Sequence, residues 1–344
     1  MNDIRRTILW VIFGFSMVML WDKWQIHNGN KPTFFPGPAP TVAQAPAPSK
    51  TASGVDSVPV ATANVAVGAQ PTGATAELVP QVSSSVAHQQ VVAETDVLKV
   101  TFDTEGGSVV RTEFLKHMDM ADKARQFVLL DDSKDRVYLA QSGLIALAGG
   151  AALPNHKSVM TLVPGERVLK DGSQSLELRF ESPEVGGVKL VKTYTLARGS
   201  YAVAVKHEVV NLGAAAVAPQ LYLQLVRDGN KPPGESSFYS TFTGPAVYTD
   251  AKKYQKVEFA DIEKNKIDIE KTADNGYVAM VQHYFASAWL LGDGIKRDLF
   301  MRRVDNNLYA VGMIAPLEAI APGARKSVEA RFFAGPQEES VLES

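Results

Sequence analysis

Short runs in which apolar and polar residues alternate recur from residue 94 to residue 336, and they limit the fold more than any other feature of this sequence. Residues 96–102, 187–196 and 326–333 are three of these runs, and Gly, Pro, Asn or Asp residues separate one run from the next. A period of two places successive side chains on opposite faces of a strand. Helical periodicity is scarce, apart from a short turn expected at residues 260–266. We therefore predict an all-β fold, a large sandwich of two antiparallel sheets.

Two turns and two uncharged stretches can be placed within this pattern. Residues 105–107 and 198–200 are rich in glycine or polar residues and are predicted hairpin turns. Residues 137–153 and 275–292 carry no charge, but glycines and polar side chains make them unsuitable as membrane spans. We predict that each is a pair of buried strands, and that His283 is a hydrogen-bonded histidine of the core.

The N-terminus contains an apolar run that is predicted to form a transmembrane anchor at residues 7–26. A bilayer core is crossed by about 20 apolar residues of helix. Basic residues before the span favour a cytoplasmic location for residues 1–6, and tryptophans lie near both ends, where membrane interfaces favour them. A cleaved secretory signal is the alternative, but the first small-residue cleavage candidate lies far downstream, at Ala43. The residues predicted to anchor and orient the span are Arg5, Arg6, Trp10, Trp21, Lys23 and Trp24.

Residues 27–93 differ in composition from the rest of the chain. Pro, Ala, Val, Thr, Ser and Gln dominate, and between residues 32 and 93 only Lys50, Asp56 and Glu77 are charged. A segment of this kind buries too little apolar surface to offset its conformational entropy. We predict a disordered Pro/Ala-rich linker, followed by the β domain at residues 94–336.

The composition and the histidine spacing exclude several classes of chemistry. The chain has no cysteine, so disulfides, thiolate catalysis and cysteine metal sites are excluded. A net charge of −2 gives no sign of the basic surface that binds nucleic acid. The six histidines follow no metal-ligand spacing, and His207 and Glu208 should point to opposite faces because they are neighbours on a predicted strand. We therefore predict no catalytic, cofactor-binding or metal-binding residue in this chain.

Four ordered segments resemble one protein family. Residues 101–108, 192–203, 276–289 and 333–337 resemble the large periplasmic domain of the YidC insertases, which belong to the YidC/Oxa/Alb family. The N-terminal span and the Pro/Ala-rich linker are also similar in kind. The motif residues predicted to form the family core are Gly106, Gly107, Tyr194, Gly199, Tyr201, Tyr284, Phe285 and Trp289.

This resemblance implies a β-supersandwich held on the periplasmic side of the inner membrane by one span. In the family, insertion depends on five later spans, so this chain would be the anchored periplasmic part of an insertase that assists membrane-protein insertion, folding and assembly. The implied partners are the lipid bilayer, nascent membrane-protein clients and Sec translocon components, and no enzyme activity or cofactor is implied. Residues 337–344, after a strand break expected at Gly335-Pro336, would begin the helix that leads back to the membrane.

Two other interpretations remain open from the sequence. The protein could be a periplasmic carbohydrate-binding or mutarotase-like β-sandwich, since supersandwiches resemble those folds. It could also be a freestanding scaffold module. A sugar enzyme needs a histidine and carboxylates that converge in one cleft.

Overall fold

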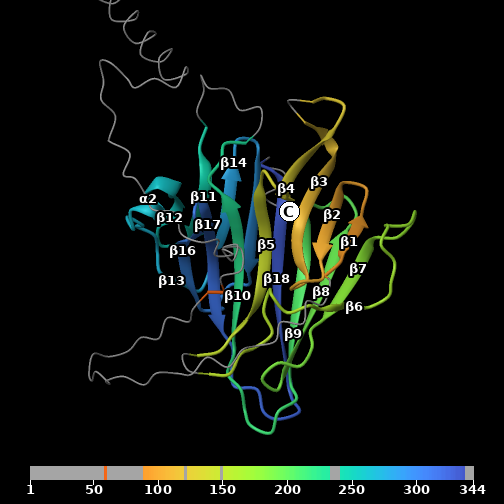
Figure 1. Cartoon of the computed structure of the whole chain (residues 1–344), viewed down its shortest axis with the longest axis vertical. Coiled ribbons are helices and arrows are strands. Elements are labelled where there is room, and N and C mark those ends of the chain that lie inside the picture. The colour runs from red at the N-terminus through yellow and green to blue at the C-terminus, as the bar shows by residue number, and fades with distance from the viewer. Residues whose placement is uncertain (1–57, 60–87, 120–121, 148–149, 233–240, 338–344) are drawn as a thin grey trace, which may run out of the picture. The chain divides into compact units, whose positions relative to one another are not determined.

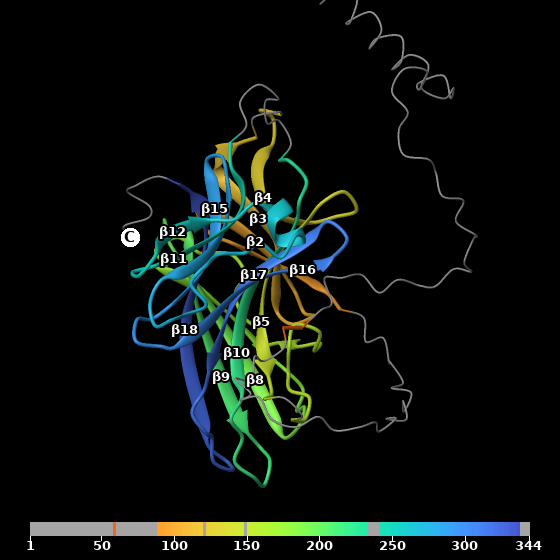
Figure 2. The same ribbon diagram turned by 90° about the vertical axis from the view of Figure 1, so that its left-hand side faces the viewer.

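The computed structural model describes residues 58–59, 88–119, 122–147, 150–232 and 241–337 (Figures 1 and 2). All of them belong to the second of the chain's two units, Ala52–Ser344. The predicted anchor at residues 7–26, most of the linker and residues 338–344 lie outside the described residues. Among the residues that are described, no helix has the length and apolarity needed to cross a membrane.

Two nine-stranded sheets make up the domain, and neighbouring strands in both are antiparallel. In spatial order, the first sheet contains β1 (Gln90–Glu94), β2 (Leu98–Asp103), β3 (Ser108–Met118), β4 (Gln126–Asp132), β5 (Val137–Ile145), β10 (Gln220–Asp228), β17 (Leu308–Pro316), β16 (Arg297–Asp305) and β13 (Thr272–Ala273). The second contains β12 (Lys253–Lys256), β11 (Thr243–Thr249), β14 (Tyr277–Gln282), β15 (Phe285–Leu291), β18 (Arg325–Pro336), β9 (Ala202–Asn211), β8 (Val188–Ala197), β7 (Ser175–Glu181) and β6 (Thr161–Leu162). The short helix α2 (Phe259–Glu263) lies where a helical turn was predicted. The prediction of an all-β fold with two antiparallel sheets is confirmed.

The core lies between the two sheets and follows the alternation of the sequence. On β10, Leu221, Leu223 and Leu225 face the core and are fully buried. On β8, the inward positions include Leu190 and Tyr194, whose exposed fractions are 1%. The two hairpins predicted at residues 105–107 and 198–200 are present as β2–β3 and β8–β9. Periodicity thus fixes which face of each strand is buried.

The described strands allow both ends of the domain to be compared with the predicted bounds, residues 94 and 336. The domain starts before residue 94, because β1 begins at Gln90 and pairs with β2, with Val91 opposite Phe102. At the other end, β18 extends to Pro336, the last residue of the predicted domain, which lies opposite Phe285. The pairing of β18 with β9 ends at Phe333, so Pro336 sits where that side of the strand needs no N–H donor.

The two uncharged stretches differ from each other. Residues 275–292 form the hairpin β14–β15, as predicted, but its turn is His283-Tyr284. His283 is therefore exposed, with a positive φ of 30°, and is not a core histidine. Among the described residues of 137–153, only β5 is a strand, and it ends at Ile145, so the stretch does not form the predicted pair. An uncharged stretch therefore indicates burial, but it does not indicate how many strands the stretch forms.

Candidate functional site

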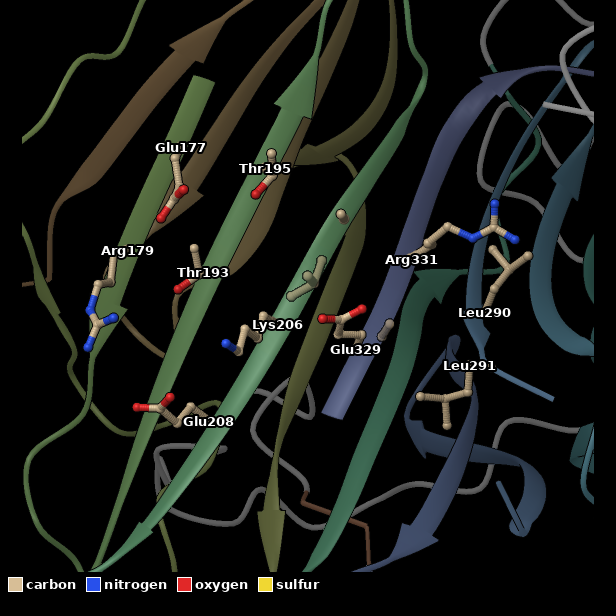
Figure 3. A pocket seen from close by; sticks show the side chains of 14 residues that line it. Glu177, Arg179, Thr193, Thr195, Lys206, Glu208, Leu290, Leu291, Glu329 and Arg331 are labelled. Atoms are coloured by element: carbon tan, nitrogen blue, oxygen red, sulfur yellow. The ribbon is translucent and has the colours of Figure 1, made fainter. Parts of the chain in front are cut away.

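The outer face of the second sheet, which points away from the core, carries a hollow of about 620 Å³ that we call the charged hollow (Figure 3). Strands β7, β8, β9, β18 and β15 contribute its lining. Its charged side chains are Glu177, Arg179, Lys206, Glu208, Glu329 and Arg331. They come from alternate positions, so each has inward-facing apolar neighbours on its own strand.

Strand register brings these side chains together from distant parts of the sequence. Lys206 lies opposite Thr193 on β8 and Glu329 on β18. Ala204, two residues before Lys206 on β9, lies opposite Thr195 on β8 and Arg331 on β18. Directly opposed residues on one face are near neighbours. The charged hollow is therefore set by the pairing of five strands and not by a mobile loop.

Several of these charges have no partner within the described part of the chain. Glu208 lies 3.6 Å from Arg325, and Arg179 lies 3.0 Å from Glu181. The side chains of Glu177, Lys206, Glu329 and Arg331 make no hydrogen bond or ion pair with other described residues, although both signs are present. Exposed charges of this kind are available to a partner without the loss of an existing contact.

A second hollow of about 380 Å³, which we call the apolar groove, continues the charged hollow across the same face. Leu290 and Arg331 line both hollows. The groove is otherwise mainly apolar, and its lining includes Tyr254, Tyr277 and Phe333. An apolar groove next to unpaired charges suits an extended polypeptide with both kinds of side chain.

The chain leaves the domain at the edge of the apolar groove. Gln337 lines the groove, and its backbone N–H donates to the carbonyl oxygen of Tyr284 at 2.7 Å. Its side-chain Nε2 donates to the carbonyl oxygens of Phe285 at 3.1 Å and His283 at 3.2 Å. These contacts fasten the end of β18 to the β14–β15 turn.

The inner face of the same strands contains a buried polar cluster, formed by Lys192, His207 and Ser142. Lys192 is fully buried, and its Nζ donates to the carbonyl oxygens of Gly106 at 2.6 Å and Ser142 at 2.7 Å. His207 Nε2 lies 2.9 Å from Ser142 Oγ. Burial lowers the pKa of Lys192 to about 7. Burial and the nearby Lys192 lower the pKa of His207 to about 3. Both residues are closed off from solvent, so the cluster is part of the core.

Three of the predicted motif residues meet at this cluster. Gly106 and Gly107 have φ values of +71° and +58° in the turn between β2 and β3. Tyr194 Oη donates to the carbonyl oxygen of Gly107 at 2.7 Å. A Cβ atom on Gly106 would lie 2.4 Å from the carbonyl oxygen of His156. The motif glycines thus allow the turn to approach another segment of backbone closely.

The other motif residues occupy separate places. Tyr201 and Phe285 are 9% exposed and join one aromatic cluster around Phe114. Trp289 is fully buried, and its Nε1 donates to the carbonyl oxygen of Gln224 at 3.1 Å. Gly199 and Tyr284 both lie in hairpin turns. Gly199 has a φ of +72° in an open turn. Tyr284 is 55% exposed at the β14–β15 turn, so its assignment to the core is wrong.

The remaining predictions concern the anchor residues, the pair His207 and Glu208, and metal ligands. The anchor residues Arg5, Arg6, Trp10, Trp21, Lys23 and Trp24 lie outside the described residues. His207 is buried between the sheets while Glu208 lines the outer hollow, so they point to opposite faces as predicted. Within the described residues, no group of three metal-ligating side chains converges.

Sequence reasoning did not select the residues that define the outer hollows or the buried cluster. Lys206, Glu329 and Arg331 looked like ordinary solvated positions of amphipathic strands. A possible clue was the presence of both charge signs at outward positions of several runs. Lys192 at an inward position of its run was a clearer clue, because buried lysine is rare.

Comparison with known proteins gives a family match and several relatives. The YidC periplasmic domain family matches residues 90–344. A protein of Cupriavidus necator named membrane protein insertase YidC is 49% identical over 341 residues, which are 99% of this chain and 59% of the relative. The protein of the same name from Janthinobacterium sp. is 46% identical over 99% of this chain and 59% of the relative. The chain thus spans about three fifths of the length of these relatives.

Comparison with solved structures also gives matches, all at low identity. A galactose mutarotase related enzyme from Lactobacillus acidophilus has a TM-score of 0.48 and 10% identity, covering 73% of this chain and 99% of that protein. A galactose mutarotase-like protein from Lactobacillus casei has a TM-score of 0.45 and 10% identity, covering 72% and 100%. At these scores the likeness says nothing about activity.

Proposed function

Because the chain belongs to the YidC periplasmic domain family, we propose that it is the anchored periplasmic part of a membrane protein insertase. In this role it assists the insertion, folding and assembly of inner-membrane proteins, with or without the Sec translocon. The observation that carries the proposal is the family match, together with relatives of nearly half identity that are named membrane protein insertase YidC. The basic pair Arg5-Arg6 and the apolar run that follows it support a single span with the β domain in the periplasm.

The outer face of the second sheet is the surface on which this domain meets a partner. Its unpaired charges and its apolar groove suit a polypeptide, either a nascent client or a Sec component. The site chemistry gives no support to a sugar enzyme, because the buried His207 and the outward Glu208 do not share a cleft. The domain acts as a binding surface and not as a catalyst.

Fractionation and protease treatment test the anchor and its orientation. The chain should be recovered with the inner membrane, and protease added to spheroplasts should digest the β domain and leave a small membrane-embedded fragment. Recovery of a soluble protein that starts after Ala45 would instead identify a cleaved signal and contradict the anchored arrangement.

Site-specific photo-crosslinking tests the binding surface. A photo-reactive amino acid at Lys206 should crosslink to a client or a Sec component during synthesis of a membrane protein. The matched control replaces the exposed Asp171, which does not line either hollow. Equal crosslinking from both positions, or none from Lys206, would contradict this surface.

A further inference from the structure

The outer face of the first sheet bears a small apolar cluster that is separate from the core between the sheets. Tyr222, Ile145 and Ile314 are its buried members, with exposed fractions of 0%, 7% and 4%. Tyr222 points away from the core, because its neighbours Leu221 and Leu223 on β10 point into it. Ile314 lies opposite Tyr222 in the register of β10 with β17. His156 covers one side of Tyr222, since its backbone N–H donates to Tyr222 Oη at 3.0 Å, and the remaining apolar surface on this outward face needs something else to cover it.

Two residues from the predicted linker pack on this cluster. Val58 is half-buried and contacts the cluster together with Phe300, and Pro59 is buried. Figure 1 draws this two-residue segment in red beside β10. Pro59 also lines a hollow of about 640 Å³, whose other walls include Phe300 and Ile314. Linker residues therefore touch the domain far from β1, where the domain begins in sequence.

The chemistry of a Val-Pro pair suits this contact. Proline has no N–H, so its backbone leaves no unsatisfied donor when it packs against an apolar surface. The residue before a proline is held in an extended conformation, which reduces the entropy lost when Val58 docks. Val58 and Pro59 belong to no strand, so side-chain packing and not sheet extension makes the contact.

We propose that Val58-Pro59 is a built-in docking point that holds the middle of the linker on the outer face of the first sheet, at Tyr222, Ile145, Ile314 and Phe300. The occupant of this patch is thus the protein's own linker. The rest of the linker then forms two shorter segments, one before and one after the docking point.

Docking at this point would limit how far the domain moves from its anchor. The root-mean-square length of a flexible chain grows with the square root of its residue number, so fastening the linker near its middle shortens the anchor-side tether roughly 1.4-fold. This consequence rests on the proposed membrane anchor. The docking itself does not, and it can be measured whether or not the anchor is correct.

The linker contains its own matched control. Val79-Pro80 is a second Val-Pro pair, and an acidic residue lies two positions before each valine, Asp56 in one case and Glu77 in the other. The two sites therefore have similar local charge and similar backbone restriction. They should differ only in whether the folded domain shields them.

Cysteine reactivity tests the proposal, since the chain has no cysteine of its own. In the full chain, Val58→Cys and Val79→Cys are made separately and treated with a maleimide. Cys is small and apolar, so it retains much of the packing of valine. If the docked state holds about nine molecules in ten, the cysteine at position 58 should react about tenfold more slowly than the cysteine at position 79. In urea the two rates should become equal, which shows that their intrinsic reactivities match.

Two further variants identify the surface that gives the protection. Pro59→Gly and Phe300→Ala should each accelerate the reaction at position 58 and leave position 79 unchanged, and a thermal melt checks that the domain remains folded. Equal rates at positions 58 and 79 in the native chain would overturn the proposal. So would stronger protection at position 79, or protection at position 58 that persists in folded Pro59→Gly and Phe300→Ala variants. If docking is confirmed but the anchor test fails, only the tether consequence is lost.

Discussion

The inner and outer faces of strands β8 and β9 carry polar side chains in two contrasting states. On β9, His207 points inward and is fully buried, whereas Lys206 and Glu208 point outward into the charged hollow. On β8, the inward Lys192 donates to two backbone carbonyls, and the outward Thr193 faces solvent. Neighbouring residues on one strand therefore differ in role: the inward side chain stabilises the fold, and the outward side chain is exposed to a partner.

This difference gives a way to divide the domain into structure and function. Inner polar groups such as Lys192 are already hydrogen-bonded within the core, so changing them should reduce the stability of the fold. Of the outer charges, Glu177, Lys206, Glu329 and Arg331 lack partners among the described residues, so changing them should affect binding and not folding. Most of the predictions that follow compare a position on the inner face with one on the outer face, and one compares two turns.

The largest effect is expected at the buried indole of β15. Trp289→Ala should reduce the free energy of unfolding by roughly 3–5 kcal/mol, because it leaves a cavity and removes a hydrogen bond. The control is the next residue, Leu290, which points outward and is half-buried, so Leu290→Ala should cost only about 1 kcal/mol. Chemical denaturation of both variants measures the difference. Equal losses would show that the outer hollows are part of the stable core.

The next effect concerns the turn that meets the buried cluster. Gly106→Ala should cost about 2–4 kcal/mol, because it combines a positive φ with a Cβ atom that collides with backbone. Gly199→Ala has nearly the same φ, but no atom lies within 4 Å of its Cβ position, so only the conformational cost of about 1 kcal/mol remains. Similar melting temperatures for the two variants would contradict the role of the close approach to His156.

These glycines show what the sequence could and could not predict. A Gly-Gly pair between two alternating runs predicts a hairpin turn, and the turn is present. Its contact with the backbone of His156 depends on a segment far along the chain, which no local pattern reports. In the same way, periodicity placed His207 and Glu208 on opposite faces, because side-chain direction is a local property of a strand.

Features that depend on the order of strands were beyond prediction. Lys192 reaches the carbonyl of Ser142 because β8 and β5 face each other across the two sheets. The charged hollow exists because β9 lies between β8 and β18. Linker composition predicts disorder throughout and gives no sign that Val58-Pro59 finds an apolar cluster. In each case the missing information is tertiary pairing.

The pH dependence of stability should separate the inner lysine from an outer one. Burial lowers the pKa of Lys192 to about 7 in the folded protein, while an unfolded lysine titrates near 10.4. Between these values the unfolded chain binds more protons, so stability should rise with pH, by at most about 1.4 kcal/mol per unit. Lys192→Met should flatten this rise between pH 7 and 9.

A matched substitution on the outer face provides the control for this pH experiment. Lys206→Met removes the same charge from the neighbouring strand, and it should leave the pH dependence as in the parent chain. Thermal melts of the three proteins across this pH range make the measurement. A parent chain whose stability does not rise between pH 7 and 9 would show that Lys192 stays protonated in the core.

The smallest effect on stability is expected on the outer face, where the effect on binding should be greatest. Glu329→Lys and Arg331→Glu exchange charges that make no ion pair with other described residues, and surface changes of this kind usually alter stability by less than about 0.5 kcal/mol. Each should nevertheless reduce crosslinking from the photo-reactive group at Lys206, because each places the wrong sign opposite the partner. Charge exchange at Asp171 serves as the control, since it lies outside both hollows. Unchanged crosslinking in both outer-face variants would show that the unpaired charges only keep the domain soluble, and the division between structural and binding faces would then fail.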